Sequence, residues 1–274
     1  MATQLLIPWF VAEPWVVHLP FRERELVVQP FAVSVIAALF VGYVVAILFA
    51  RKHDRPVDLT LNLALYLVGF AFPISYLLNG LFYQPDKFFH VLTRPSEIAG
   101  AGLGWSMYGG IIGTIIGALV WKWRRKASIL AVGDSFAFAG PFGWTIARLG
   151  CFVTHDHPGR VSDFFLAVAD YQTGAPPYEP RHDLGLYGAI VLTGVAITFF
   201  VLNQKPRKPG FYVGLLPMLH APCRFMLDFL RAPAAEGGDL RYAGLTPAQY
   251  VAVILFVAGV LVMRRVARSD AAPS

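Results

Sequence analysis

Residues 144 to 160 read WTIARLGCFVTHDHPGR, and this stretch decides the fold class. It begins as part of an apolar run long enough for a membrane helix, yet it contains Arg148 and ends in two histidines around an aspartate. An arginine costs roughly 2.5 to 3.5 kcal/mol to insert near the membrane centre, and less toward the interface. The stretch therefore predicts a membrane helix that ends in a polar site.

The composition supports a membrane fold. The chain has 274 residues, of which 56% are hydrophobic and only 15% are charged, and its mean hydropathy is +0.56. These values lie outside the usual range of soluble domains. Runs of about twenty apolar residues, enough to cross a ~30 Å hydrocarbon core, occur near residues 28 to 50, 59 to 83, 98 to 121, 132 to 153, 184 to 203, 210 to 230 and 246 to 263. We expect an all-α polytopic membrane protein with about seven transmembrane helices.

Basic residues predict the orientation of these helices, because Lys and Arg collect in short cytoplasmic loops. Thirteen of the 23 lie in four clusters that follow alternate spans: Arg51, Lys52, Arg55, Lys122, Arg124, Arg125, Lys126, Lys205, Arg207, Lys208, Arg264, Arg265 and Arg268. This pattern places the N-terminus outside and the C-terminus in the cytoplasm. It also explains the net charge of +6, so we expect no nucleic-acid partner.

One membrane domain, residues 1 to 274, accounts for the whole chain. Residues 1 to 27 carry Trp9 and Trp15 and are expected to form an arm at the outer interface, where Trp prefers to lie. No basic segment precedes an apolar core there, so we expect no signal peptide. Residues 154 to 183 form an outer loop with polar site residues. The two cysteines, Cys151 and Cys223, exclude a disulfide framework, and both are expected to be small buried residues.

Two arginines within predicted spans indicate a lipid site. Arg148 and Arg224 lie toward the outer ends of the fourth and sixth spans. Either one alone could extend its side chain to the headgroups. Together they predict a shared cavity that opens to the outer leaflet and holds a phosphate, because a guanidinium offers a planar fork of donors to phosphate oxygens.

Glycines in the third span have two interpretations. Gly109, Gly113 and Gly117 recur every four residues and make a small face for close helix packing. Alternatively, Gly109 and Gly110 allow a lipid headgroup to approach the backbone, with Tyr108 beside it.

Two further clusters flank the arginines. Asp228 follows Arg224 by four residues and precedes Arg231 by three, which is a charge ladder on one helical face and a means of orienting Arg224. His155, Asp156 and His157 suggest metal ligands at first sight, but adjacent residues alternate in direction, so we expect no metal. Cys151 and His155 are four apart and could form a thiolate-imidazole pair; a polar loop is the simpler interpretation.

These motifs resemble the bacterial prolipoprotein diacylglyceryl transferases, seven-span plasma-membrane enzymes. ARLGCFVTHDHPGR, residues 147 to 160, is similar to the family signature Gly-Arg-x-Gly-Asn-Phe-x-Asn-x-Glu and the Gly-Arg that follows it. YGGIIG, PRHDLGLY, RFMLDFLR and LTPAQY resemble four further family segments, beginning at residues 108, 180, 224 and 245. The similarity extends from the first span to Tyr250.

The resemblance implies transfer of the diacylglyceryl group of phosphatidylglycerol to the lipobox cysteine of a prolipoprotein, with glycerol phosphate leaving and no cofactor needed. We expect the catalytic residues to be Arg148, Arg224, Tyr108 and His155. The residues expected to bind phospholipid are Gly109, Gly110, Gly113, Asp156, Gly159, Arg160, Asp228 and Arg231.

This chain departs from the family at three site positions. Tyr108 occupies the position of the family's histidine, Cys151 that of its signature asparagine, and Thr154 that of a second asparagine. Tyrosine is a poor base at neutral pH, so we hypothesise that His155 or His157 supplies the base. The alternatives are a different acceptor, a non-catalytic protein that binds lipid or lipoprotein, and a transporter.

Overall fold

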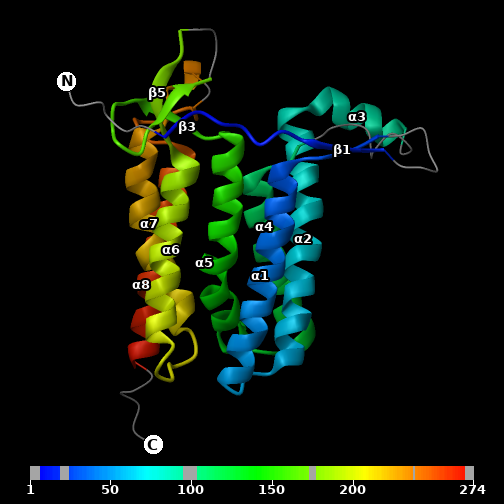
Figure 1. Ribbon diagram of the computed structural model, residues 1–274. Helices are drawn as coiled ribbons and strands as arrows, with labels where there is room; N and C mark the ends of the chain where they lie inside the picture. The colour runs from blue at the N-terminus through cyan, green and yellow to red at the C-terminus, as the bar shows by residue number, and fades with distance from the viewer. Residues whose placement is uncertain (1–6, 19–24, 95–103, 173–176, 237, 269–274) are drawn as a thin grey trace, which may run out of the picture. The chain divides into compact units, whose positions relative to one another are not determined.

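The computed structural model describes residues 7–18, 25–94, 104–172, 177–236 and 238–268, and it is mostly helical (Figure 1). The chain forms two compact units. Residues 1–49 and 134–274 make up the first, and residues 50–133 make up the second. Each unit is described separately below.

Six helices of the described part are long and apolar enough to cross a membrane. They are α1 (Pro30–Lys52), α2 (Val57–Tyr83), α5 (Ile129–Thr154), α6 (Leu184–Leu202), α7 (Phe211–Leu227) and α8 (Pro247–Arg268). The protein is therefore a polytopic helical membrane protein, as expected. The third predicted span, residues 98 to 121, corresponds to α4 (Met107–Arg125), and part of it falls outside the described residues. Seven spans and the orientation of the termini stay predictions.

The second unit consists of α2, the short α3 (Pro85–Thr93) and α4. The glycines of α4 allow its backbone to lie directly against α2. A Cβ atom on Gly109 would come within 2.7 Å of the Ser75 Cα, and one on Gly117 within 2.6 Å of the Tyr66 carbonyl oxygen. The packing interpretation of this glycine face is therefore confirmed. Gly110 points elsewhere, since nothing among the described residues lies within 4 Å of its added Cβ.

Five of the long helices contribute to the first unit, whose aromatic core contains Phe49, Phe138, Phe199 and Tyr212. Beside this core, the buried carboxylate of Asp134 on α5 accepts hydrogen bonds from the backbone N–H groups at the start of α7. The donors are those of Gly210 at 2.7 Å, Tyr212 at 2.9 Å and Val213 at 3.0 Å. Because the first N–H groups of a helix have no partner within the helix, Asp134 attaches α7 to α5.

Two small antiparallel sheets complete the first unit, which the all-α expectation missed. β1 (Trp15–His18) pairs with β2 (Glu25–Val28) within the N-terminal arm. β3 (Pro158–Val161), β4 (Val168–Tyr171) and β5 (Glu179–Asp183) form a sheet in the order β3-β5-β4 within the predicted outer loop (Figure 1). The sequences of β3, β4 and β5 are PGRV, VADY and EPRHD, and they lack the alternation of polar and apolar residues that predicts a strand. The backbone of Ile7 also pairs with Ala167 and Ala169 beside β4.

The α2–α4 contact gives a stability prediction. Gly113→Val places a side chain against the backbone, because its Cβ alone would come within 2.7 Å of the Ala71 Cα. We expect a loss of about 1 to 3 kcal/mol in the free energy of unfolding, as for other overpacked interiors, measured as a lower midpoint of thermal unfolding in detergent. Gly110→Ala is the matched control and should be neutral or slightly stabilising. Equal midpoints for the two variants would contradict this packing.

Candidate functional site

Arg148 and Arg224 line one cavity of the first unit, as the sequence predicted. Arg231 and His220 also face this cavity, which we call the arginine cavity. Its lining residues are Arg148, Leu184, Gly188, Val191, His220, Arg224, Leu227 and Arg231. It is narrow, with a volume of about 10 Å³, room for about one water molecule. Three guanidinium groups, from α5, from α7 and from the segment that follows α7, thus converge on one small space.

Glycines on α6 make room for Arg148 on α5. A Cβ on Gly188 would lie 3.2 Å from the Arg148 Cδ, so the arginine stem passes over this glycine. One turn earlier, a Cβ on Gly185 would lie 2.7 Å from the backbone nitrogen of Phe152. The two helices therefore approach closely at the level of the site, and the guanidinium extends past α6 into the arginine cavity.

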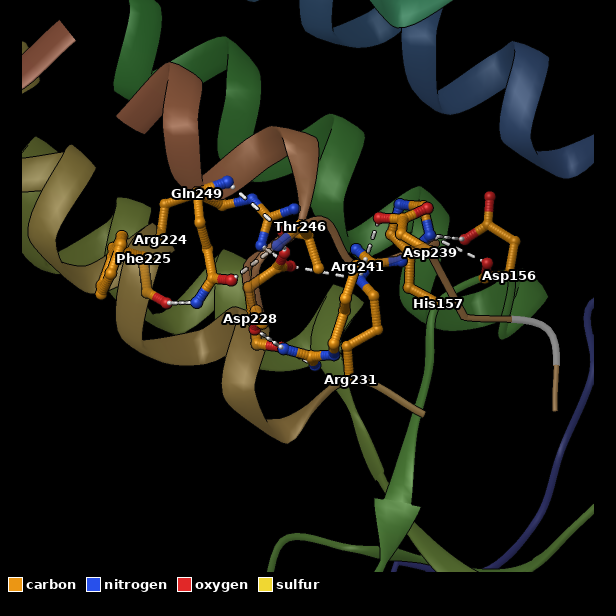
Figure 2. A network of polar contacts seen from close by, with 11 residues as sticks. Asp156, His157, Arg224, Phe225, Asp228, Arg231, Asp239, Arg241, Thr246 and Gln249 are labelled. Carbon is orange, nitrogen blue, oxygen red and sulfur yellow. Dashed lines mark hydrogen bonds and ion pairs between the residues drawn. The ribbon is translucent and has the colours of Figure 1, made fainter. Parts of the chain in front are cut away.

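Asp228 is the centre of a polar network at the end of α7 (Figure 2). Its fully buried carboxylate pairs with Arg224, accepts a hydrogen bond from the Thr246 hydroxyl and lies 3.1 Å from the Arg231 Nε. The predicted charge ladder is confirmed. Arg241 donates to the Asp228 carbonyl oxygen at 3.0 Å and closes the network from the following loop.

Thr246 and Gln249 connect this network to α8. The Gln249 side chain accepts from the Thr246 N–H at 2.8 Å and donates to the Phe225 carbonyl oxygen at 3.1 Å (Figure 2). Both residues are fully buried. The segment that resembles Thr-x-x-Gln therefore fixes the start of α8 against the end of α7.

His155 lies in a different environment from the one its predicted catalytic role requires. Its side chain is 1% exposed, and its Nδ1 lies 2.7 Å from the Asp183 carboxylate. Trp9 stacks on the ring at 4.6 Å, and the Tyr171 hydroxyl donates to the His155 carbonyl oxygen. Burial, with a further contribution from Asp183, raises the pKa of Tyr171. The geometry of His155 favours a structural role, which joins the N-terminal arm to the sheet.

Cys151 lies beside Asp156 and His157 rather than paired with His155 as one interpretation expected. The physical reason is that α5 ends at Thr154 and His155 adopts a left-handed backbone conformation with φ of 49°. The ligand atoms of Cys151, Asp156 and His157 lie within 4.8 Å of one another. Burial raises the pKa of Asp156, whereas burial and then the charge of Arg148 lower the pKa of His157 to about 3. Because Arg148, Arg231 and Arg224 also act on His157, a dication would be repelled, and we assign no metal.

The remaining predicted site residues are divided between the two units. Gly159 packs between strands and helix, since its added Cβ would lie 2.5 Å from the His182 Cβ and 2.9 Å from the Leu230 carbonyl oxygen. Arg160 is exposed on β3. Tyr108 belongs to α4, and its side chain lies outside the described residues. Gly109, Gly110 and Gly113 also belong to the second unit, so their role in lipid binding stays a prediction.

The sequence interpretation missed three side chains. Arg181 on β5 is buried, donates to the Gly159 carbonyl oxygen at 3.2 Å and pairs with Glu236 at 2.6 Å. Asp183 accepts from the Leu186 N–H at 3.0 Å at the start of α6. His220 faces the arginine cavity. Of these three residues, only His220 could have been predicted from the sequence, because it precedes Arg224 by four residues and so lies on the same helical face.

Fold and site define a class of protein: a polytopic helical membrane protein with a cluster of guanidinium groups at one end of its helices. Comparison with known proteins identifies the family. Residues 19–265 match the sequence model of the family described as prolipoprotein diacylglyceryl transferase. The chain belongs to this family of membrane transferases, as its motifs suggested.

Individual relatives carry the name phosphatidylglycerol–prolipoprotein diacylglyceryl transferase. The one from Gluconacetobacter diazotrophicus is 29% identical over all of this chain and 96% of its own length. The one from Pseudomonas paraeruginosa is 31% identical over 70% of this chain and 71% of its own. The relative from Chromohalobacter salexigens is 34% identical over 57% of this chain. The matched region spans 58% of that relative's own length.

The network around Asp228 gives a second stability prediction. Asp228→Asn removes the charge that compensates Arg224 and Arg231, and breaking a buried ion pair typically costs about 3 to 5 kcal/mol. We expect a clearly lower midpoint of thermal unfolding in detergent. Asp239→Asn is the matched control: its carboxylate lies 3.3 Å from the Arg231 Nε but is 47% exposed, so its loss should cost at most about 1 kcal/mol. Similar midpoints for both variants would show that Asp228 does not stabilise the network.

Proposed function

We propose that this protein transfers the diacylglyceryl group of phosphatidylglycerol to the cysteine thiol of a prolipoprotein lipobox and releases glycerol phosphate. The observation that carries this proposal is the convergence of Arg148 and Arg224, from two different helices, on one cavity. Membership of the transferase family supports the reaction type.

The chain's charges support a site that faces the outer leaflet of a bacterial plasma membrane. Within the first unit, α6 starts directly after β5 and runs away from the sheet to the basic loop with Lys205, Arg207 and Lys208 (Figure 1). The helix α7 returns from that loop, and its end reaches the sheet, where Arg231 bridges Gly159. Basic loops prefer the cytoplasm, so the arginine cavity, which lies at the sheet end, faces outside.

The arginines have the chemistry that the reaction needs. The thiolate sulfur attacks the glyceryl carbon, the carbon–oxygen bond to phosphate breaks, and negative charge accumulates on the departing phosphate. Guanidinium donors that are fixed beforehand in a dry cavity stabilise this charge. Asp228 holds Arg224 in position through its ion pair. The narrow cavity opens for the headgroup when the long arginine side chains separate.

The other predicted residues have supporting roles in this proposal. Asp156 lies in electrostatic range of Arg148 and helps to orient it. Gly159 and Arg231 join the sheet to the end of α7 through their backbone pairing. Arg160, on the exposed face of β3, attracts the anionic membrane surface.

Removing either arginine tests the assignment. We expect Arg148→Ala and Arg224→Ala to lower the rate of glycerol phosphate release by about 10² to 10³, which is the usual effect of losing one donor to a developing anion. Arg148→Lys keeps the charge but loses the planar fork, so it should also be impaired. The rate is measured with phosphatidylglycerol and a lipobox peptide in detergent micelles. Arg265→Ala, at the far end of α8, is the control and should retain the wild-type rate. Near-normal turnover by both alanine variants would refute the phosphate assignment.

The acceptor requires a separate experiment. We expect a lipobox peptide to gain the mass of a diacylglyceryl group, and the same peptide with its cysteine changed to serine to gain none. A protein that releases glycerol phosphate equally with both peptides uses a different acceptor. A protein that binds phosphatidylglycerol vesicles but releases nothing is a non-catalytic member of the family. Mass spectrometry of the peptide distinguishes these results.

A further inference from the structure

His220 is the histidine that lines the arginine cavity. All seven histidines of the chain lie in the described part, and the other six are absent from its lining. His220 precedes Arg224 by one helical turn on α7, so both side chains face the same space. Its position provides the cavity with an imidazole, whose ring nitrogens can accept and donate a proton.

The ring of His220 is held in place without using its nitrogens. Trp144 on α5 contacts its face, with ring centroids 4.6 Å apart and an interplanar angle of 40°. The ring is half-buried, and no hydrogen bond joins its nitrogens to any residue that the structure describes. The aromatic contact fixes the ring while leaving a nitrogen free to accept a proton from a substrate.

The other histidines near the sheet are already engaged. His155 binds Asp183 through Nδ1, His157 lies 2.8 Å from the Asp156 carbonyl oxygen, and His182 lies 2.7 Å from the Tyr187 hydroxyl. Neither His155 nor His157, the two bases expected from the sequence, lines the arginine cavity, whereas His220 does.

We propose that His220 is the general base that removes the proton from the acceptor thiol. This inference rests on the proposed function. It identifies a base for this chain, in which Tyr108 occupies the position of the family's histidine. The neutral imidazole takes the thiol proton while the sulfur–carbon bond forms. The carbon–oxygen bond breaks, and its electron pair leaves with the phosphate of glycerol phosphate. The proton then passes from the imidazolium to this phosphate, whose second pKa is ~6.

The surroundings of His220 suit a base that works beside an anion. Arg148 faces it from α5, Arg224 from the end of α7 and Arg231 from the segment after α7, whereas α6 contributes only Leu184, Gly188 and Val191 to the lining. Asp228 compensates Arg224 and Arg231 from behind. The same cations that hold the phosphate therefore bring the lipid's reacting carbon close to the imidazole.

The test measures how the transfer rate depends on pH for the wild type and for His220→Gln in detergent micelles with phosphatidylglycerol and a lipobox peptide. General bases typically contribute 10² to 10⁴ in rate, so we expect the variant to lose at least ~10²-fold near pH 7. Its rate should recover as the pH approaches the ordinary thiol value of ~8.5, where the thiolate forms without help. Added imidazole should restore part of the rate at pH 7. His182→Gln, outside the cavity, should keep the wild-type profile.

The outcomes separate this role from the proposed function. A wild-type protein that transfers nothing overturns the function and this role together. If the wild type is active and the rate of His220→Gln falls at low pH in the same way as the wild-type rate, only the proposed role of His220 is wrong. An equal loss at every pH, without rescue by imidazole, also overturns the role and shows that His220 only supports the cavity. A comparable KM for phosphatidylglycerol in variant and wild type excludes loss of lipid binding as the cause.

Discussion

The buried carboxylate of Asp228 is the interaction on which the site depends. A guanidinium in an apolar helix bundle is costly unless a partner compensates its charge. Asp228 pairs with both Arg224 and Arg231 and is itself fully buried. Two other carboxylates contribute at the edge of the site, since Asp239 lies 3.3 Å from the Arg231 Nε and Asp156 lies in electrostatic range of Arg148. The lining itself holds three guanidinium groups, and their donors make the cavity complementary to an anion.

The features that the sequence predicted correctly are those with a short-range pattern. Apolar runs identify spans because the required length is fixed by the thickness of the membrane. The spacing of Arg224, Asp228 and Arg231 predicts an ion-pair ladder because residues three and four apart meet on one helical face. The four-residue repeat of Gly109, Gly113 and Gly117 predicts a contact face by the same geometry, although it cannot identify α2 as the partner.

The features that the sequence could not predict depend on where the chain turns. His155 and Cys151 are four apart, but the helix ends between them, and the left-handed conformation of His155 directs its ring toward Asp183. Asp183 lies 28 residues away, and no local pattern indicates that pairing. The strands β3 to β5 are equally hidden, since their partners are set by the ends of α5 and α6. A search for bases near Arg148 in sequence therefore selects His155 and His157 and overlooks His220.

The helix α7 determines which distances at the site are fixed and which can change. His220 and Arg224 are four residues apart on one face of α7, whereas Asp228 begins the 3-10 turn that follows this helix and Arg231 comes directly after the turn in an extended conformation. His220 and Arg224 are separated along the helix axis by roughly 6 Å, and Thr246 and Gln249 hold the end of this helix against α8. The positions of His220 and Arg224 relative to each other are therefore set by one helix. Arg148 comes from α5 and reaches the cavity only across Gly188. In the proposed function a headgroup enters this narrow cavity, so we expect the side of Arg148 to move while α7 keeps its geometry.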